Sequence, residues 1–266
     1  MHVPERGELH RAISAYDSVA TAYEVGRPSY PAEAVAWLIA EGIIGPGRVV
    51  LDLAAGTGKL TRLLLESGAR VIAVEPVASF RQALAPLSVE IREGTAERIP
   101  LAADAVDAVT VAAAFHWFDA PRALEEIARV LRPGGALAVL WNERDPHDET
   151  QRALTALLEP HRRDEPRQAD EAWLKAFACD RRFMTVRKRD FVHRHTFTAD
   201  TLVERVRSIS FVAALADEPH ARLLEQVREL ARTHLRERAA VPGETFELPH
   251  VTHVYLTALA SGDQRP

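Results

Sequence analysis

The most constraining feature of this chain is the stretch LDLAAGTGKLT, residues 51–61, in which an apolar run meets a glycine turn and then a helical pattern. The run RVVLDLA before the turn is almost wholly apolar, which is typical of a strand buried in the middle of a parallel sheet. Gly56 and Gly58 allow the backbone of the turn to approach another group closely. We therefore expect a ligand to lie across this turn.

Strand and helix patterns alternate through the first half of the chain. The apolar runs ARVIAVEP, SVEIREG, AVDAVTVAAAF and GALAVLWN alternate with helical patterns at 58–67, 78–87 and from Asp119 onward. Asp119 is a suitable N-cap for the last of these helices, and the apolar face beyond it consists of Leu124, Ile127, Ala128 and Leu131. This rhythm predicts an α/β fold, a parallel sheet with right-handed crossovers and helices on both faces. In such sheets ligands bind at the carboxyl ends of the strands.

The second half of the chain has a different character. Helical patterns cover 148–163, 170–178 and 200–240, and the segment 186–197, VRKRDFVHRHTF, carries so many charges that it predicts an edge strand. The segment FELPHVTHVYLTAL predicts the last strand. With no long linker, we expect a single domain. Its parts would be a helical cap over 1–46, a cofactor-binding half over 47–145, a C-terminal half over 146–259 with a lid around 198–240, and a tail over 260–266.

Composition narrows the function classes. A net charge of -5 and 47% hydrophobic residues describe an ordinary globular chain without a broad phosphate-binding surface. The single cysteine, Cys179, excludes an intramolecular disulfide and a cysteine-based zinc cage, and favours a reducing cytoplasm. The pairs His193/His195 and His250/His253 lack an HExxH pattern, so we expect no metal. No apolar run approaches the roughly 20 residues of a membrane span, which predicts a soluble cytoplasmic protein.

Three ligands compete for the glycine turn. A nucleoside triphosphate requires GxxxxGK[ST], but Leu60 stands where the hydroxyl residue belongs. A dinucleotide requires GxGxxG, and Thr61 occupies the place of the third glycine. Glu75, about 20 residues onward, matches the acidic residue of that pattern, so a nicotinamide dinucleotide stays an alternative.

The third ligand is a nucleoside without phosphates. Asp52 would repel a pyrophosphate but would favour an ammonium group. Glu75 can accept hydrogen bonds from ribose hydroxyls. A ligand with a ribose and an amino-acid tail satisfies both carboxylates, and S-adenosylmethionine is such a ligand.

Six motifs in order carry a resemblance to a known family. They are YDSVATAYEVGRPSYP, LDLAAGTGKLT, VIAVEP, EGTAERIP, FHWFD and LRPGG, within a match that covers roughly residues 16–142. The chain resembles the class I S-adenosylmethionine-dependent methyltransferases, in the type-11, ubiquinone-biosynthesis-like group that mostly modifies small molecules. This resemblance implies a Rossmann-like, mostly parallel sheet of order 3-2-1-4-5-7-6, with the last strand antiparallel.

The resemblance also implies a cofactor site. Gly56 and Gly58 would approach the methionine portion, Glu75 would hold the ribose, and the EGTAERIP loop would line the adenine. The implied residues are Tyr16, Tyr23, Arg27, Asp52, Gly56, Thr57, Gly58, Glu75, Pro76, Thr95, Ala96 and Glu97. Two positions depart from the pattern: Ala54 stands where relatives commonly have glycine, and Thr95 stands where many have aspartate.

The motif FHWFD supplies candidates for the chemistry. Methyl transfer from a sulfonium is an in-line displacement, and aromatic faces attract a cation. We expect Phe115, Trp117 and Phe118 to line the acceptor pocket, with Trp117 equally suited to a core wall. His116 would be either a general base or a residue that only orients its surroundings by hydrogen bonding.

The absence of certain motifs narrows the acceptor. The chain has no [DNS]PP[YFW] motif of exocyclic-amine methylases, and Cys179 lies far from any predicted strand end. The sequence thus predicts methyl transfer to O, N or C of a small molecule, with S-adenosylhomocysteine as product and no nucleic-acid partner. The alternatives are an NAD(P)-dependent oxidoreductase and a catalytically silent S-adenosylmethionine-binding module. Monomer and homodimer both stay open.

Overall fold

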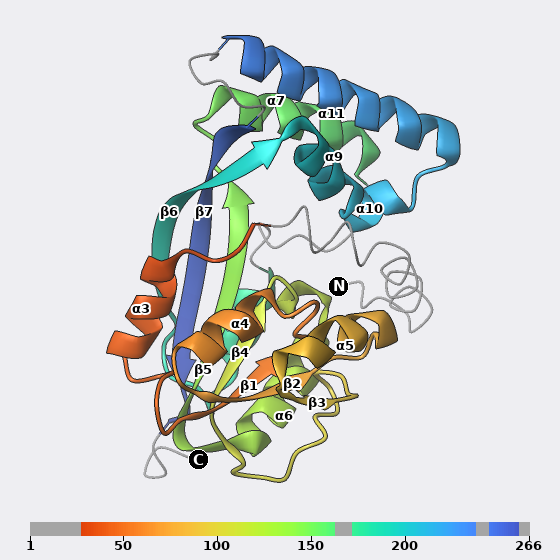
Figure 1. Ribbon diagram of the computed structural model, residues 1–266. Coiled ribbons are helices and arrows are strands. Elements are labelled where there is room, and N and C mark those ends of the chain that lie inside the picture. The colour runs from red at the N-terminus through yellow and green to blue at the C-terminus, as the bar shows by residue number, and fades with distance from the viewer. Residues whose placement is uncertain (1–27, 163–171, 238–244, 261–266) are drawn as a thin grey trace.

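A computed structural model describes residues 28–162, 172–237 and 245–260, which form a seven-stranded sheet of order β3-β2-β1-β4-β5-β7-β6 (Figure 1). Its strands are β1 (Val49–Leu53), β2 (Arg70–Val74), β3 (Glu90–Arg92), β4 (Val106–Ala112), β5 (Leu131–Arg144), β6 (Arg187–Thr198) and β7 (Thr245–Ala258). Strands β1 to β5 pair in parallel, and β7 runs antiparallel to both β5 and β6. The predicted strand order and the antiparallel last strand are confirmed.

Helices cover both faces of the sheet. They are α3 (Ala32–Ala40), α4 (Lys59–Glu66), α5 (Ala78–Leu84), α6 (Ala120–Val130), α7 (Glu149–Leu158), α8 (Ala172–Cys179), α9 (Ala199–Arg207), α10 (Ser210–Ala213) and α11 (Asp217–Glu237), with short 3-10 turns η1 (Ala85–Leu87), η2 (Phe115–Trp117) and η3 (Glu159–His161). Leu38 of α3 and Leu64 of α4 join one core layer, whereas Ile127 of α6 and Trp173 of α8 join the opposite one. No helix in the described ranges is long and apolar enough to cross a bilayer.

Local signals explain most element boundaries. Asp119 caps α6 as predicted, since its carboxylate accepts a hydrogen bond from the Arg122 N–H at 3.5 Å. Leu131 was expected on the apolar face of this helix, but it begins β5 and pairs with Val106. The run AVDAVTVAAAF was expected to be a strand to Phe115, but β4 ends at Ala112, because the next residue turns into the left-handed region with a φ of 54°.

A separate helical unit stands above the sheet. Strands β5, β6 and β7 continue past the other strands and meet helices α7, α9, α10 and α11 (Figure 1). Leu158 of α7, Val206 of α9 and Val227 of α11 share its apolar core with Phe197 and Leu248 of the strands. The segment around 198–240, which was expected to form a lid, contains α9, α10 and α11 where it is described, and it packs together with α7. We call α7 and α9–α11 the helical unit.

Candidate active site

The glycine turn joins β1 to α4 through a series of left-handed residues. Ala54, Gly56 and Gly58 have φ values of 57°, 56° and 87°. The N–H groups of Ala54 and Ala55 both donate to the Val74 carbonyl of β2, at 2.8 and 3.2 Å. A Cβ at Gly58 would lie 2.6 Å from Leu87 Cδ1 and 2.7 Å from Leu84 Cδ2. Gly58 thus has a conformation that favours glycine, and a Cβ there would force the ends of the Leu84 and Leu87 side chains to shift. Ala54 adopts the left-handed conformation despite its side chain.

Glu75 fastens this turn to the end of β2. Its carboxylate accepts hydrogen bonds from the Gly56 N–H at 2.8 Å and from the Val77 N–H at 2.9 Å. The residue is only 3% exposed, and this burial raises the pKa of Glu75, opposed by the two N–H donors and by Arg81. Each carboxylate oxygen keeps a second acceptor position. Glu75 therefore shapes the turn itself, which the sequence did not indicate.

Asp52 lies beneath the turn rather than on its surface. Its carboxylate accepts hydrogen bonds from Thr61 Oγ1 at 2.6 Å and from Thr110 Oγ1 at 3.2 Å. Burial raises the pKa of Asp52 to about 7. Thr61 stands where a dinucleotide fingerprint has its third glycine, and here its side chain fills that space and supports Asp52. This packing disfavours the dinucleotide alternative.

In the sheet, β2 and β3 lie on one side of β1 and β4 lies on the other. The loop after β3 is therefore on the side away from β4. Thr95 forms an isolated bridge with Arg98, and Ala96 is buried. Glu97 accepts a hydrogen bond from the Asp119 N–H at 3.0 Å, which ties this loop to the start of α6. The carbonyl of Pro76 accepts a hydrogen bond from Arg81. These expected adenine-side residues thus gather beyond the ends of β2 and β3.

The FHWFD segment divides between core and surface. Phe115 is fully buried, with ring centroids 5.3 Å from Phe177, 5.3 Å from Phe118 and 5.6 Å from Trp173. The expectation that Phe115 lines a pocket is corrected, because its ring belongs to an aromatic core built with α8. The sequence gave no sign of that contact, since α8 is distant along the chain.

His116 is held by an indole. Trp141 Nε1 donates to His116 Nδ1 at 3.4 Å, and the His116 ring lies 5.0 Å from that of Trp117. An indole N–H can only donate, so Nδ1 is the acceptor and a neutral His116 carries its proton on Nε2. In this arrangement Nε2 offers a hydrogen-bond donor rather than a basic lone pair.

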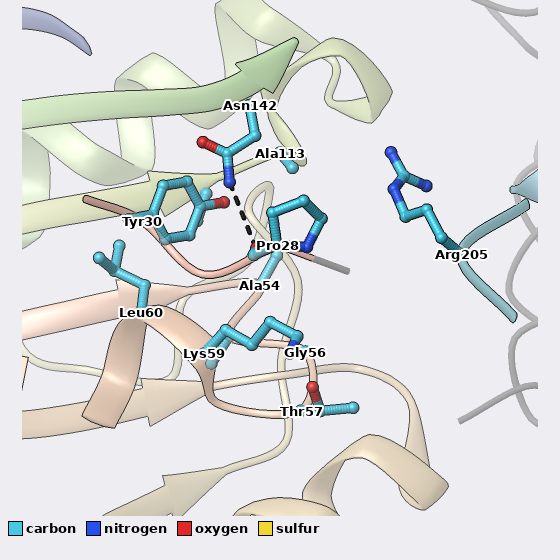
Figure 2. Close-up of a pocket in the computed structure, with 12 residues that line it drawn as sticks. Pro28, Tyr30, Ala54, Gly56, Thr57, Lys59, Leu60, Ala113, Asn142 and Arg205 are labelled. Carbon is cyan, nitrogen blue, oxygen red and sulfur yellow. Dashed lines mark hydrogen bonds between the residues drawn. The ribbon is translucent and has the colours of Figure 1, made fainter. Parts of the chain in front are cut away.

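An open pocket lies beside the glycine turn (Figure 2). Ala54 and Lys59 line it from the turn and α4, Asn142 lines it from the end of β5, and Arg205 reaches it from α9. The Asn142 amide donates to the carbonyls of Pro28 and Ser29 at 3.3 and 3.0 Å. Its oxygen accepts from Thr252 Oγ1 at 2.5 Å. Asn142 thereby holds the chain at Pro28 against the sheet.

Comparison with known proteins decides the family. The family model described as "Methyltransferase domain" matches residues 51–139. An uncharacterised methyltransferase of Mycobacterium tuberculosis strain H37Rv is 39% identical over 249 residues, which cover 92% of this chain and 96% of that protein. The chain belongs to the class I S-adenosylmethionine-dependent methyltransferases.

Two further similarities agree. An uncharacterised methyltransferase-like protein of Schizosaccharomyces pombe is 32% identical to the methyltransferase over 79% of this chain and 83% of its own length. A solved structure from Anaeromyxobacter dehalogenans, titled as a type II methyltransferase, has a TM-score of 0.59 and 25% identity, covering 87% of this chain and 97% of that one. The sheet order is the one found in this fold.

The residues of the methyltransferase fit an adenosyl ligand without phosphates. Thr57 Oγ1 is buried and has no hydrogen-bond partner among the described residues, so the turn carries one unsatisfied polar atom beside its glycines. Glu75 keeps acceptor positions, and Asp52 supports the turn from below. Tyr16, Tyr23 and Arg27 lie outside the described residues.

Three residues that line the pocket were not predicted from the sequence as site residues: Asn142, Lys59 and Arg205. Asn142 could have been found, since it ends a predicted strand at the edge where ligands bind. Lys59 follows the second glycine, at the place where a nucleoside-triphosphate pattern has its phosphate-binding lysine, and nothing else in the sequence marks it. No sequence signal placed Arg205 at the pocket, because it approaches from a helix more than 140 residues after the turn.

A buried histidine near the pocket, His250, makes the stability of the methyltransferase depend on pH. Burial lowers the pKa of His250 to about 3, with nearby Arg205, His193 and His195 adding to the effect. His250 Nδ1 lies 3.1 Å from the Leu248 carbonyl and Nε2 lies 3.5 Å from the Gln151 amide, which suits a neutral ring.

Because only the unfolded state binds this proton between pH 6.5 and 3, the His250 contribution to stability is lost as the pH falls below about 6.5. The stability difference between wild type and His250→Asn should therefore shrink by about 2 kcal/mol between pH 7 and pH 5. Urea unfolding at both pH values measures this. A difference that stays constant would show that His250 binds its proton normally in the folded state. Comparing the variant with wild type cancels the opposite contribution of Asp52.

Proposed function

We propose that this methyltransferase transfers the methyl group of S-adenosylmethionine to O, N or C of a small-molecule acceptor in the cytoplasm. The observation that carries this proposal is the glycine turn, in which Glu75 holds the Gly56 N–H and Thr61 fills the place of the third glycine. Such a turn suits a sugar and an amino-acid tail, because a threonine occupies the position where a pyrophosphate-binding fingerprint has its third glycine.

The cofactor would be held on both sides of β1. The backbone at Gly56 and Gly58 would admit its methionine portion, with Thr57 Oγ1 as a hydrogen-bonding group. Glu75 would accept from the ribose hydroxyls with its remaining acceptor positions, while Pro76, Thr95, Ala96 and Glu97 would border the adenine. Asp52 acts through Thr61 and the turn. We extend the proposal to Tyr16, Tyr23 and Arg27, which the family resemblance implies at the methionine end.

The acceptor would lie toward β4 and β5. In the sheet order, β2 and β3 lie on one side of β1, and β4 and β5 lie on the other. A nucleoside over the first pair directs the methionine end toward the second pair, where the pocket opens. The bound cofactor supplies an electrophilic methyl group, and the chain's own contribution is mainly orientation, which is worth roughly 7–11 kcal/mol in favourable cases. Trp117 and Phe118 would border the acceptor.

A small acceptor is supported by the surroundings of the pocket. The helical unit stands over the carboxyl edge of the sheet and contributes Arg205 to the pocket (Figures 1 and 2). The basic segment of β6 is engaged locally: Arg187 pairs with Glu41 at 2.6 Å, and Lys188 pairs with Asp190 at 3.7 Å. Neighbouring carboxylates therefore offset part of the positive charge of this segment.

His116 is proposed as a hydrogen-bond donor to the acceptor. With Nδ1 occupied by Trp141, His116→Gln can present an amide N–H near the position of Nε2–H, whereas His116→Ala cannot. We expect kcat to fall about 10- to 100-fold in His116→Ala and less than tenfold in His116→Gln, as for one positioned polar group. Methyl-transfer rates from pH 6 to 9 provide the check. If the wild-type rate falls below neutral pH and this fall is lost in both variants, His116 is instead the general base.

Activity itself is tested with labelled S-adenosylmethionine. The purified protein is incubated with the labelled compound and a metabolite extract of its host, and labelled small molecules are identified by mass spectrometry. We expect one or a few methylated metabolites, which are absent when the extract is first depleted of molecules below about the size of a peptide. Label found only in protein or nucleic acid would overturn the small-molecule proposal. No label, despite tight cofactor binding, would favour a silent binding module.

A further inference from the structure

Arg205 occupies a defined position in the pocket. Helix α9 begins with a capping box between Thr198 and Thr201, and it buries Leu202 and Val206 in the core of the helical unit. This anchoring fixes which side of α9 faces the glycine turn, and Arg205 lies on that side. Its side chain extends from α9 toward Asn142 and Pro28 (Figure 2).

The charged side chains that line this pocket in the described part of the chain have the same sign. Among its lining residues in the described ranges, Lys59 and Arg205 are the charged ones, and both are positive. Asp52 and Glu75 do not line it, because each is buried on other partners. The histidines behind it add no positive charge at neutral pH, since burial lowers the pKa of His195 to about 4 and that of His250 to about 3. An anionic ligand group is therefore favoured in this pocket.

The direction of approach separates the ligands. The ribose and adenine side lies over β2 and β3, beyond Glu75. Arg205 arrives from the opposite side of the glycine turn, on a helix that follows β6 at the far edge of the sheet. Arg205 therefore enters the pocket from the side of the helical unit and not from the proposed ribose and adenine side.

We propose that Arg205 binds a carboxylate of the methyl acceptor, so that the acceptor is a small carboxylic acid. This inference rests on the proposed function and adds the substrate class to it. A guanidinium offers a planar pair of N–H donors that matches a carboxylate, and Lys59 adds a second positive charge. Arg205 is accordingly a specificity-determining residue contributed by the helical unit.

A carboxylate in this pocket has two possible sources, the acceptor and the amino-acid tail of the cofactor. Binding measurements distinguish them. S-adenosylhomocysteine is compared with 5′-methylthioadenosine, which lacks the amino-acid tail. Small mono-, di- and tricarboxylic acids are then compared with their amides, on protein saturated with S-adenosylhomocysteine. Calorimetry is used for wild type, Arg205→Ala, Arg205→Gln and the control Arg222→Ala, whose exposed side chain on α11 pairs with Glu218.

We expect at least one acid to bind the wild-type complex ten times more tightly than its amide. Arg205→Ala and Arg205→Gln should each lose this preference, Arg222→Ala should keep it, and the Kd of S-adenosylhomocysteine should change less than twofold in all variants. Three results would overturn the proposal: no acid preferred over its amide, an unchanged preference in both Arg205 variants, or an equal loss of S-adenosylhomocysteine affinity, which would assign Arg205 to the cofactor tail.

Two controls keep the outcomes separate. Far-ultraviolet circular dichroism and thermal melting show whether each variant is folded, and the glutamine variant keeps a polar side chain of comparable reach if the alanine variant is unstable. Failure of wild type to bind S-adenosylhomocysteine at all would contradict the proposed function, whereas intact binding without selectivity for acids would contradict only the role of Arg205.

Discussion

Replacing Glu75 with alanine is expected to weaken the binding of S-adenosylhomocysteine by about 100-fold or more. The substitution leaves the N–H groups of Gly56 and Val77 without their carboxylate acceptor, and it also removes the proposed ribose contact. Hydrogen bonds to charged groups contribute about 1.5–3 kcal/mol each, and about 2.8 kcal/mol corresponds to a 100-fold change in Kd. Calorimetric titration of the folded variant measures the effect.

Two control variants show whether the loss of affinity is due to the Glu75 carboxylate. Glu75→Gln keeps one acceptor oxygen but no charge, so its affinity should lie between those of wild type and Glu75→Ala. Glu90→Ala removes a carboxylate of β3 that pairs with Arg70 and Arg92 at the surface, and its affinity should equal that of wild type. Affinity of Glu75→Ala within threefold of wild type would remove Glu75 from the cofactor site.

Replacing Gly58 with alanine is expected to lower the free energy of unfolding by about 2–5 kcal/mol and to abolish measurable methyl transfer. The left-handed conformation destabilises the folded state by roughly 1–2 kcal/mol when the residue has a Cβ. The added Cβ would also lie 2.6 Å from Leu87 Cδ1, and such overpacking costs about 1–3 kcal/mol more. The Leu84 and Leu87 side chains, or the turn itself, would have to move. Urea unfolding and a methyl-transfer assay read the two effects separately.

Gly134 offers a matched control. It has a φ of 74°, close to that of Gly58, but an added Cβ would meet nothing within 4 Å. Gly134→Ala should therefore show only the conformational part of the loss, about 1–2 kcal/mol, and keep its activity. Equal destabilisation by both substitutions would mean that the contacts with Leu84 and Leu87 carry no penalty.

The sheet was largely predictable because its signals are local. Buried strands read as apolar runs, glycines and Asp119 mark the ends of helices, and the family motifs supplied the strand order. The charges of β6 identified an edge strand correctly. Two element boundaries were predicted wrongly, because the local sequence pattern continues past the point where the backbone changes direction. Ala113 turns the chain out of β4 with a φ of 54°. Leu131 starts β5 although it continues the apolar period of the preceding helix.

The site was predictable as a location but not in its connections. Sequence reasoning placed Asp52, Gly56 and Glu75 at one turn, yet it could not show that Thr61 and Thr110 hold Asp52 from below. Phe115 looked like a pocket residue because it follows a strand end, whereas its neighbours in the core come from α8. Contacts of this kind depend on how distant elements pack, and no local period encodes them.

The packing of distant elements also explains why the sequence did not predict that Lys59 and Arg205 line one pocket. Lys59 sits within the turn motif, but Arg205 belongs to α9, which the sequence marked only as part of a helical lid. The helical unit brings that residue to the carboxyl edge of the sheet because β5, β6 and β7 extend beyond the other strands. The position of Arg205 thus depends on the length of β5, β6 and β7 and not on a sequence motif.

The most direct measurement is a calorimetric titration of the wild-type protein with S-adenosylhomocysteine, followed by a competing titration with NADH. An adenosyl ligand without phosphates at the end of β1 predicts one binding site per chain with micromolar or tighter affinity, unaffected by NADH. No heat from S-adenosylhomocysteine, or its displacement by NADH, would contradict the account.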